Sequence, residues 1–167
     1  MNLKLEKAQL FVFCFPDYVK VCRKRSGLLK RKKMKKPLNE KANEQKTILV
    51  VDDESSSLNL IDFVLQKNHY QTLLACKGEE ALKLVEKKIP DLIILDYLMP
   101  TISGIEVCQL LKINPLTKNI PILFISAVVA HNNVEDGLRA GASAYLFKPF
   151  DPDKMIAKIE ELIGGKI

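Results

Sequence analysis

The sequence predicts an α/β domain in which a five-stranded parallel sheet is covered by helices on both faces. Short apolar runs alternate with segments of helical periodicity from Thr47 onward, and the connections between them are short. Strict alternation of this kind, with right-handed crossovers, requires parallel strands. At 167 residues, 47% of them hydrophobic, the chain can bury one good core but hardly two.

The predicted strands are short runs rich in β-branched, aliphatic and aromatic residues. In chain order they are Ile48–Val51, Tyr70–Ala75, Leu92–Leu95, Pro121–Ile125 and Ala144–Phe147. The third run is wholly apolar, which is typical of a strand that is buried on both faces.

A helix is predicted after each strand. The apolar residues at helical spacing are Leu58, Ile61, Val64 and Leu65, then Ala81, Leu82, Val85 and Ile89, then Val107, Leu110 and Leu111, and last Met155, Ile156, Ile159, Leu162 and Ile163. A weaker fourth helix covers about residues 132–140. The predicted end signals are Ser55 or Ser56 as the first N-cap, Pro90 after the second helix, a Ser103-x-x-Glu106 capping box, and Gly141 after the fourth helix.

Charge is distributed unevenly along the chain. Met1–Lys46 holds 14 Lys or Arg against 4 Asp or Glu, whereas residues 47–167 hold 12 against 16. We therefore expect a basic, disordered extension at 1–46 and one domain at 47–167, with Met34 a candidate for the true start. A basic arm for nucleic acid or an anionic membrane surface is the alternative for the extension. The basic pI itself is no argument that the domain binds nucleic acid.

No apolar run reaches the roughly 18 residues that a membrane span needs, and we expect a cytoplasmic protein.

Polar residues follow four of the predicted strands at the point where each strand ends. These residues are Asp52 and Asp53, Asp96, Ser126 and Lys148. Each alone is an ordinary cap, turn or surface residue, but all five are expected at the sheet edge where such folds bind ligands. Crowded carboxylates repel one another unless a cation neutralises them. Hard oxygen ligands, with no His or Cys at metal-ligand spacing, indicate Mg²⁺.

The segment Thr47–Ile163 resembles the receiver domain of bacterial two-component response regulators. The matching motifs are Ile48-Leu-Val-Val-Asp-Asp-Glu54, Asp96-Tyr-Leu-Met-Pro100 followed by Ser103-Gly104, Ser126-Ala127, and Gly141-Ala-Ser-Ala-Tyr-Leu-Phe-Lys-Pro-Phe150. The resemblance implies a flavodoxin-like strand order, 2-1-3-4-5.

The resemblance also implies a role for each polar residue. Asp96 would accept a phosphoryl group from a phosphohistidine on a histidine kinase or histidine phosphotransfer protein. Asp53, Asp96 and the main-chain carbonyl of Leu98 would bind Mg²⁺, with Asp52 binding directly or through water. Lys148 and Ser126 would stabilise charge on the phosphoryl oxygens.

Four further residues take supporting or switching roles by the same resemblance. Ala127 would leave an approach path, Pro149 would form a cis bond after Lys148, and Gly104 would allow tight loop packing. On phosphorylation Ser126 would move inward and Tyr145 would rotate, which changes the surface formed by the fourth helix, fifth strand and fifth helix.

Two alternative functions fit the sequence less well. A Mg²⁺-dependent phosphatase or phosphotransferase that forms an aspartyl phosphate would need an acid two residues after Asp96, where Leu98 stands. A DNA-associated regulator would depend on the basic arm, which carries no recognisable DNA-binding motif. We therefore expect a receiver that is no enzyme beyond its own phosphorylation and dephosphorylation, that acts through an unknown protein target, and that takes no small molecule besides a phosphodonor. Dimerisation on phosphorylation stays open.

Overall fold

The computed structural model describes residues 45–127 and 131–164. The elements are β1 (Thr47–Val51), α1 (Ser55–Lys67), β2 (Gln71–Ala75), α2 (Gly78–Lys87), β3 (Leu92–Asp96), α3 (Gly104–Ile113), β4 (Ile122–Ser126), α4 (His131–Arg139), β5 (Ala144–Phe147) and α5 (Pro152–Gly164). All ten predicted elements are present, with bounds within a few residues of those expected. The predicted extension lies almost wholly outside the described residues and stays a prediction.

The five strands form one parallel sheet in the order β2-β1-β3-β4-β5, as expected. Val51 pairs with Leu95 across β1 and β3, and Asp96 pairs with Ile125 across β3 and β4. The carboxyl ends of the central strands are therefore level with one another. The chain leaves β1 and β3 toward opposite sides of the sheet, and such a switch point is where doubly wound folds bind ligands.

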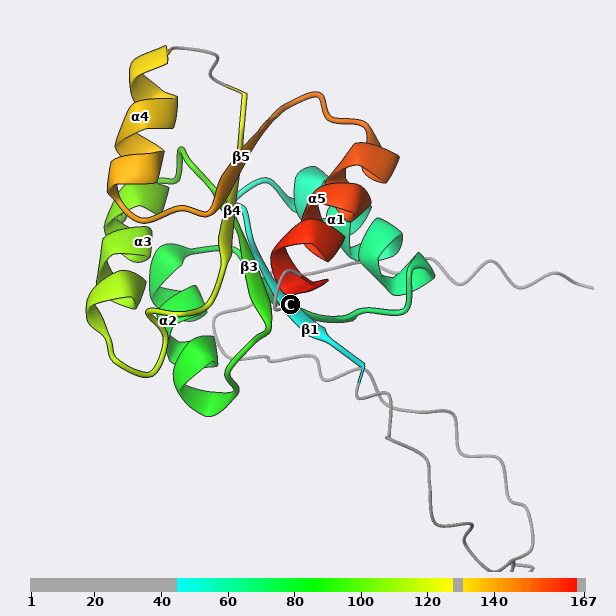
Figure 1. The fold of residues 1–167 in the computed structure, drawn as a ribbon, viewed down its shortest axis with the longest axis horizontal. Coiled ribbons are helices and arrows are strands. Elements are labelled where there is room, and N and C mark those ends of the chain that lie inside the picture. The colour runs from blue at the N-terminus through cyan, green and yellow to red at the C-terminus, as the bar shows by residue number, and fades with distance from the viewer. Residues whose placement is uncertain (1–44, 128–130, 165–167) are drawn as a thin grey trace, which may run out of the picture. The chain divides into compact units, whose positions relative to one another are not determined.

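Helices cover both faces of the sheet. In Figure 1, α1 and α5 lie on one side of the strands, and α2, α3 and α4 lie on the other. Alternate residues of each strand supply the two cores: Ile48 and Val50 pack with α1 and α5, whereas Leu49 and Val51 pack on the opposite face. Every residue of β1, β3 and β4 is buried. This burial holds the ends of the three strands in place beneath the polar residues.

Helix ends agree with the sequence prediction at two places. Ser103 and Glu106 form both hydrogen bonds of the predicted capping box at the start of α3. Gly141, after α4, has a φ of +103°, a conformation that favours glycine.

Three local predictions are wrong. The N-cap of α1 is Glu54 rather than Ser55 or Ser56, because the helix begins one residue earlier than the serine caps require. Ile89 is exposed because α2 ends at Lys87 and the chain is already extended at the next residue. Leu110 lies on the outer side of α3, and Cys108 takes the buried position instead.

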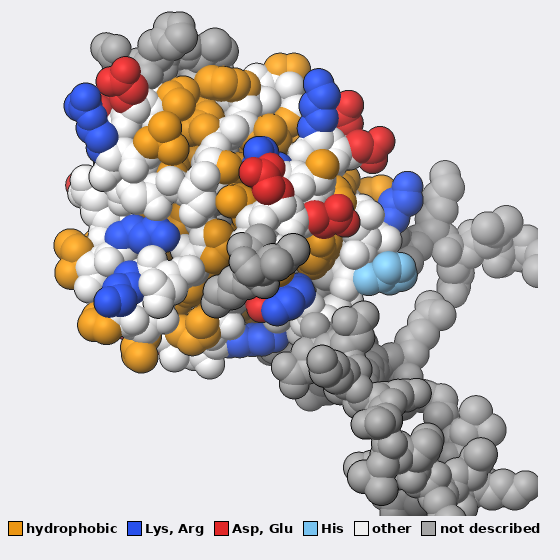
Figure 2. Space-filling model, viewed as in Figure 1, with side chains coloured by type: hydrophobic (Ala, Val, Ile, Leu, Met, Phe, Trp, Pro, Cys, Tyr) orange, Lys and Arg blue, Asp and Glu red, His pale blue; other side chains and the backbone are white. Residues whose placement is uncertain are grey.

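Charged side chains of both signs are interspersed over the face of the domain that Figure 2 shows. None of the helices within residues 45–127 and 131–164 combines the length and apolar character needed to span a bilayer.

Thr101 is the one described β-branched residue with a positive φ, at 76°, and it lies in the loop between β3 and α3. A β-branched side chain in this region clashes with its own backbone. The strain costs about 1–3 kcal/mol. Contacts with the rest of the domain therefore hold the loop after Asp96 in a backbone conformation that Thr101 disfavours.

Replacing Thr101 by Gly should raise the free energy of unfolding by about 0.5–1 kcal/mol, measured by urea denaturation. Glycine relieves the strain, and the greater freedom of the unfolded chain offsets part of the gain. Thr101→Ala keeps the Cβ atom and should gain less. A glycine variant less stable than the original protein would contradict this account.

Candidate functional site

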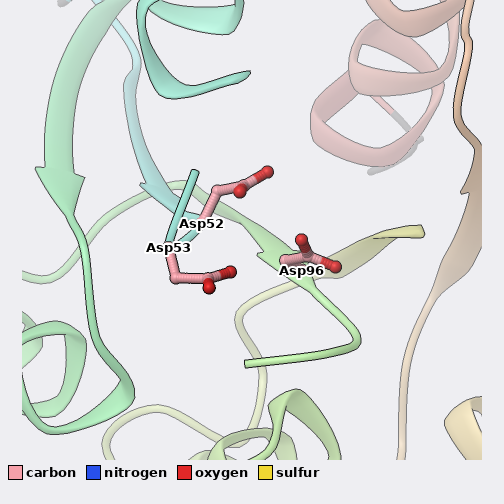
Figure 3. Close-up of side chains that lie close together, drawn as sticks. All are labelled: Asp52, Asp53 and Asp96. Atoms are coloured by element: carbon pink, nitrogen blue, oxygen red, sulfur yellow. The ribbon is translucent and has the colours of Figure 1, made fainter. Parts of the chain in front are cut away.

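Asp52, Asp53 and Asp96 come together at the carboxyl edge of the sheet, as predicted. One carboxylate oxygen from each lies within 4.8 Å of the others. Figure 3 shows the three side chains close together at the ends of β1 and β3. Asp52 and Asp96 are buried, with 1% and 8% of their surface exposed, and Asp53 is exposed. The group therefore has two buried acids and one that faces solvent.

Lys148 reaches this cluster from the end of β5. Its Nζ atom lies 2.6 Å from Oδ2 of Asp52 and 3.0 Å from Oδ2 of Asp96. The backbone N–H of Lys148 donates to the Ser126 carbonyl, which extends the β4–β5 pairing by one residue. The bond to Pro149 is cis, as predicted. The lysine thus joins the acids of β1 and β3 across the intervening strand β4.

Asp52 has two further donors. The N–H of Glu54 donates to Oδ1 at 2.9 Å, and the hydroxyl of Ser57 donates to Oδ2 at 2.5 Å. Ser57 is not among the predicted site residues, and of the serines that follow Asp53 only Ser55 and Ser56 are predicted to have a role, as candidate N-caps. Its position could have indicated this contact, because Ser57 lies in the first turn of a helix that starts shortly after Asp52 and Asp53.

The loop behind Asp96 is tightly packed. The N–H of Leu98 donates to Oδ1 of Asp96 at 3.2 Å, while the Leu98 side chain is exposed. A Cβ atom on Gly104 would overlap the main-chain carbonyl oxygen of Asp96. The expectation that Gly104 permits close packing is therefore confirmed.

The other predicted residues lie beside the acids at the ends of β4 and β5. Ser126 is fully buried and Ala127 is exposed. The half-buried Tyr145 ring packs at a tilt against the rings of Phe124 and Phe147, with centroids 6.0 and 5.1 Å away. Its buried hydroxyl lies near Ser126 but makes no hydrogen bond of ordinary distance and angle within residues 45–127 and 131–164.

Burial and charge shift the pKa values of the site in predictable directions. Burial raises the pKa of Asp96, and the Asp52 charge adds to this, while Lys148 and the Leu98 N–H act in the opposite sense. Burial alone would lower the pKa of Lys148. Its hydrogen bonds and charge attraction to Asp52 and Asp96 outweigh burial, so the pKa is raised. Lys148 therefore stays charged at neutral pH.

The donor set fits a hard divalent cation. Its three carboxylates supply only oxygen ligands, and the Lys148 ammonium already shows that positive charge is favourable between them. Asp52, Asp53 and Asp96 are the residues that would hold Mg²⁺.

In Mg²⁺-free buffer at pH 7, Asp96→Asn should be more stable to urea than the original protein. The folded-state pKa of Asp96 is above its ordinary value of 3.8, so its ionised form destabilises the fold at neutral pH. The advantage should shrink as the pH falls through the raised folded-state pKa toward 3.8, and it should vanish below 3.8, where Asp96 is protonated in both states.

Asp91→Asn is the matched control and should have the opposite sign at pH 7. Burial opposes ionisation of Asp91 too, but its hydrogen bonds to Lys46 and Thr47 prevail and lower its pKa. An advantage of Asp96→Asn that grows in acid would contradict the assignment.

The chain is similar to known proteins in both sequence and structure. The family model "Response regulator receiver domain" matches residues 48–160. The alkaline phosphatase synthesis transcriptional regulatory protein PhoP of Bacillus subtilis is 41% identical over 118 residues, which cover 71% of this chain and 48% of PhoP. The chain spans about half or less of the length of such curated relatives.

Two solved receivers have the same fold. The receiver domain of the Francisella response regulator 1452 is 30% identical with a TM-score of 0.68, covering 74% of this chain and 100% of that one. The receiver domain of the sensor histidine kinase PA1611 of Pseudomonas aeruginosa is 25% identical with a TM-score of 0.68, covering 72% and 98%. That structure has a magnesium ion coordinated in its active-site cleft.

The matched family model and the acidic pocket at the ends of β1 and β3 lead to one conclusion: the chain belongs to the response regulator receiver domain family, whose members accept phosphorylation in two-component systems.

Proposed function

We propose that Asp96 accepts a phosphoryl group from a phosphohistidine of a histidine kinase or histidine phosphotransfer protein. A carboxylate oxygen of Asp96 would bond to phosphorus as the bond from phosphorus to the histidine nitrogen breaks. The observation that carries this proposal is the place of Asp96 within reach of both the Asp52–Asp53 pair and the Lys148 ammonium.

Each neighbour of Asp96 has a physical role in the proposal. Mg²⁺ bound by the three acids would supply positive charge to the phosphoryl oxygens, as the metal-bound PA1611 receiver supports. Lys148 lies 3.0 Å from Asp96 and would pair with a phosphoryl oxygen once Asp96 is modified. The Ser126 hydroxyl would donate to another oxygen, and the small Ala127 side chain would leave the approach open.

The output in this proposal is a change in the surface formed by α4, β5 and α5. A phosphoryl group adds charge and acceptor oxygens beside Ser126. Tyr145 packs between Phe124 and Phe147, with its hydroxyl near Ser126, so a shift of that serine alters the space available to the ring. The ring would pass the change to the surface of β5, where a protein target would bind.

The proposal is for a binding switch, with no turnover of a separate substrate. A phosphatase would need an acid two residues after Asp96, and the exposed apolar side chain of Leu98 stands there. The PhoP relative is named a transcriptional regulatory protein, and about half of its length lies outside the match. Any DNA-directed output would therefore need to come through a partner or another part of the protein.

The full chain should acquire acid-labile phosphate when incubated with acetyl phosphate and Mg²⁺, measured by intact mass or by phosphate-affinity electrophoresis. Asp96→Asn should acquire none, because it lacks the attacking carboxylate. Asp91→Asn, which changes an acid at the opposite end of β3, should be labelled like the original protein. Labelling of Asp96→Asn at the original level would show that the acceptor is another residue.

A further inference from the structure

The carboxylate of Asp52 is held by three protein donors, two from the start of α1 and one from the end of β5. Oδ1 accepts the Glu54 N–H, and Oδ2 accepts both the Ser57 hydroxyl and the Lys148 ammonium. A carboxylate oxygen has two lone pairs. Oδ2 is therefore saturated, and the remaining capacity of Asp52 toward a cation is on Oδ1.

The two donors to Oδ2 differ in how firmly they can hold it. Lys148 is long and flexible, with four carbons between its backbone and its charge. Ser57 has a single side-chain torsion, and it precedes Leu58, which is fully buried in the core under α1. The terminal torsion of a carboxylate is broad when nothing fixes it. Of the two donors to Oδ2, the Ser57 hydroxyl is thus the one able to fix the rotation of the Asp52 carboxylate, together with the Glu54 N–H on Oδ1.

The neighbouring serine makes a different contact. The Ser56 hydroxyl donates to Oε1 of Glu54 at the surface, and both residues are exposed. Ser56 and Ser57 are adjacent in the same turn and carry the same chemical group, but only Ser57 contacts a carboxylate of the acidic cluster.

We propose that Ser57 is a positioning residue of the metal site: its hydroxyl orients Asp52 so that the acidic cluster binds a divalent cation more tightly. The proposal rests on the proposed function only in taking Asp52, Asp53 and Asp96 as that cation's ligands. Hydrogen bonds that orient metal-binding side chains are commonly worth about 10- to 100-fold in metal affinity. The low end applies here, because Glu54 and Lys148 still hold Asp52 when Ser57 is changed.

The test is Mg²⁺ binding to the full, unphosphorylated chain, measured by isothermal titration calorimetry. Ser57→Ala should raise the Kd for Mg²⁺ about tenfold. Ser57→Thr restores a hydroxyl and should return the Kd to near the original value. The serine lines a groove of about 270 Å³, which leaves room for the added methyl group. Ser56→Ala removes the same atom one residue away and should leave the Kd unchanged.

Three results would overturn the proposal: an unchanged Kd in Ser57→Ala, equal weakening in Ser56→Ala and Ser57→Ala, or no recovery in Ser57→Thr. Equal weakening in the two alanine variants, or no recovery in Ser57→Thr, would mean that the substitutions only destabilise the start of α1. Phosphate uptake from acetyl phosphate distinguishes these failures from failure of the proposed function. Ser57→Ala should reach the original labelling rate at saturating Mg²⁺, since a positioning residue acts through affinity, whereas Asp96→Asn should stay unlabelled at any Mg²⁺ concentration.

Discussion

The ion pairs of Lys148 with Asp52 and Asp96 are the interaction on which the rest of the site depends. Two buried carboxylates at the ends of neighbouring strands would repel each other strongly without a counter-charge. Leaving such buried charges unpaired costs about 3–5 kcal/mol. Lys148 therefore stabilises the folded protein with these acids close together in the absence of metal and phosphate. The same acids would bind a divalent cation.

The sheet makes this arrangement rigid. β1, β3 and β4 are buried along their whole length, and their paired register sets Asp52 level with Asp96, with Ser126 one residue beyond the Ile125 that pairs with Asp96. The same edge carries features that oppose stability: the raised pKa of Asp96 and the positive φ of Thr101. Functional sites commonly contain strained or otherwise unfavourable residues, which the surrounding core holds in position.

Two sets of contacts connect the acids to the surface of the domain. The Ser57 hydroxyl joins Asp52 to the first turn of α1, and the aromatic side chains around Tyr145 lie between Ser126 and the outer part of β5. In the proposed function the first set would tune cation binding and the second would report phosphorylation. Each can be altered without touching Asp96, so their contributions can be measured separately.

The sequence by itself determined the ten elements, the capping box at Ser103 and the meeting of the acids, Ser126 and Lys148 at one edge. These follow from local periodicity and from the rule that parallel strands end together; the strand order came from the family resemblance. Only the tertiary structure decided that Glu54 caps α1, that Ser57 binds Asp52, that Cys108 is buried where Leu110 is not, and that Tyr145 packs against Phe124. The burial of Cys108 and the packing of Tyr145 depend on residues far away in the sequence, such as Ala140 and Phe124. The Glu54 cap and the Ser57 contact are local, but they depend on the residue at which α1 begins, and apolar periodicity does not define a helix start to within one residue.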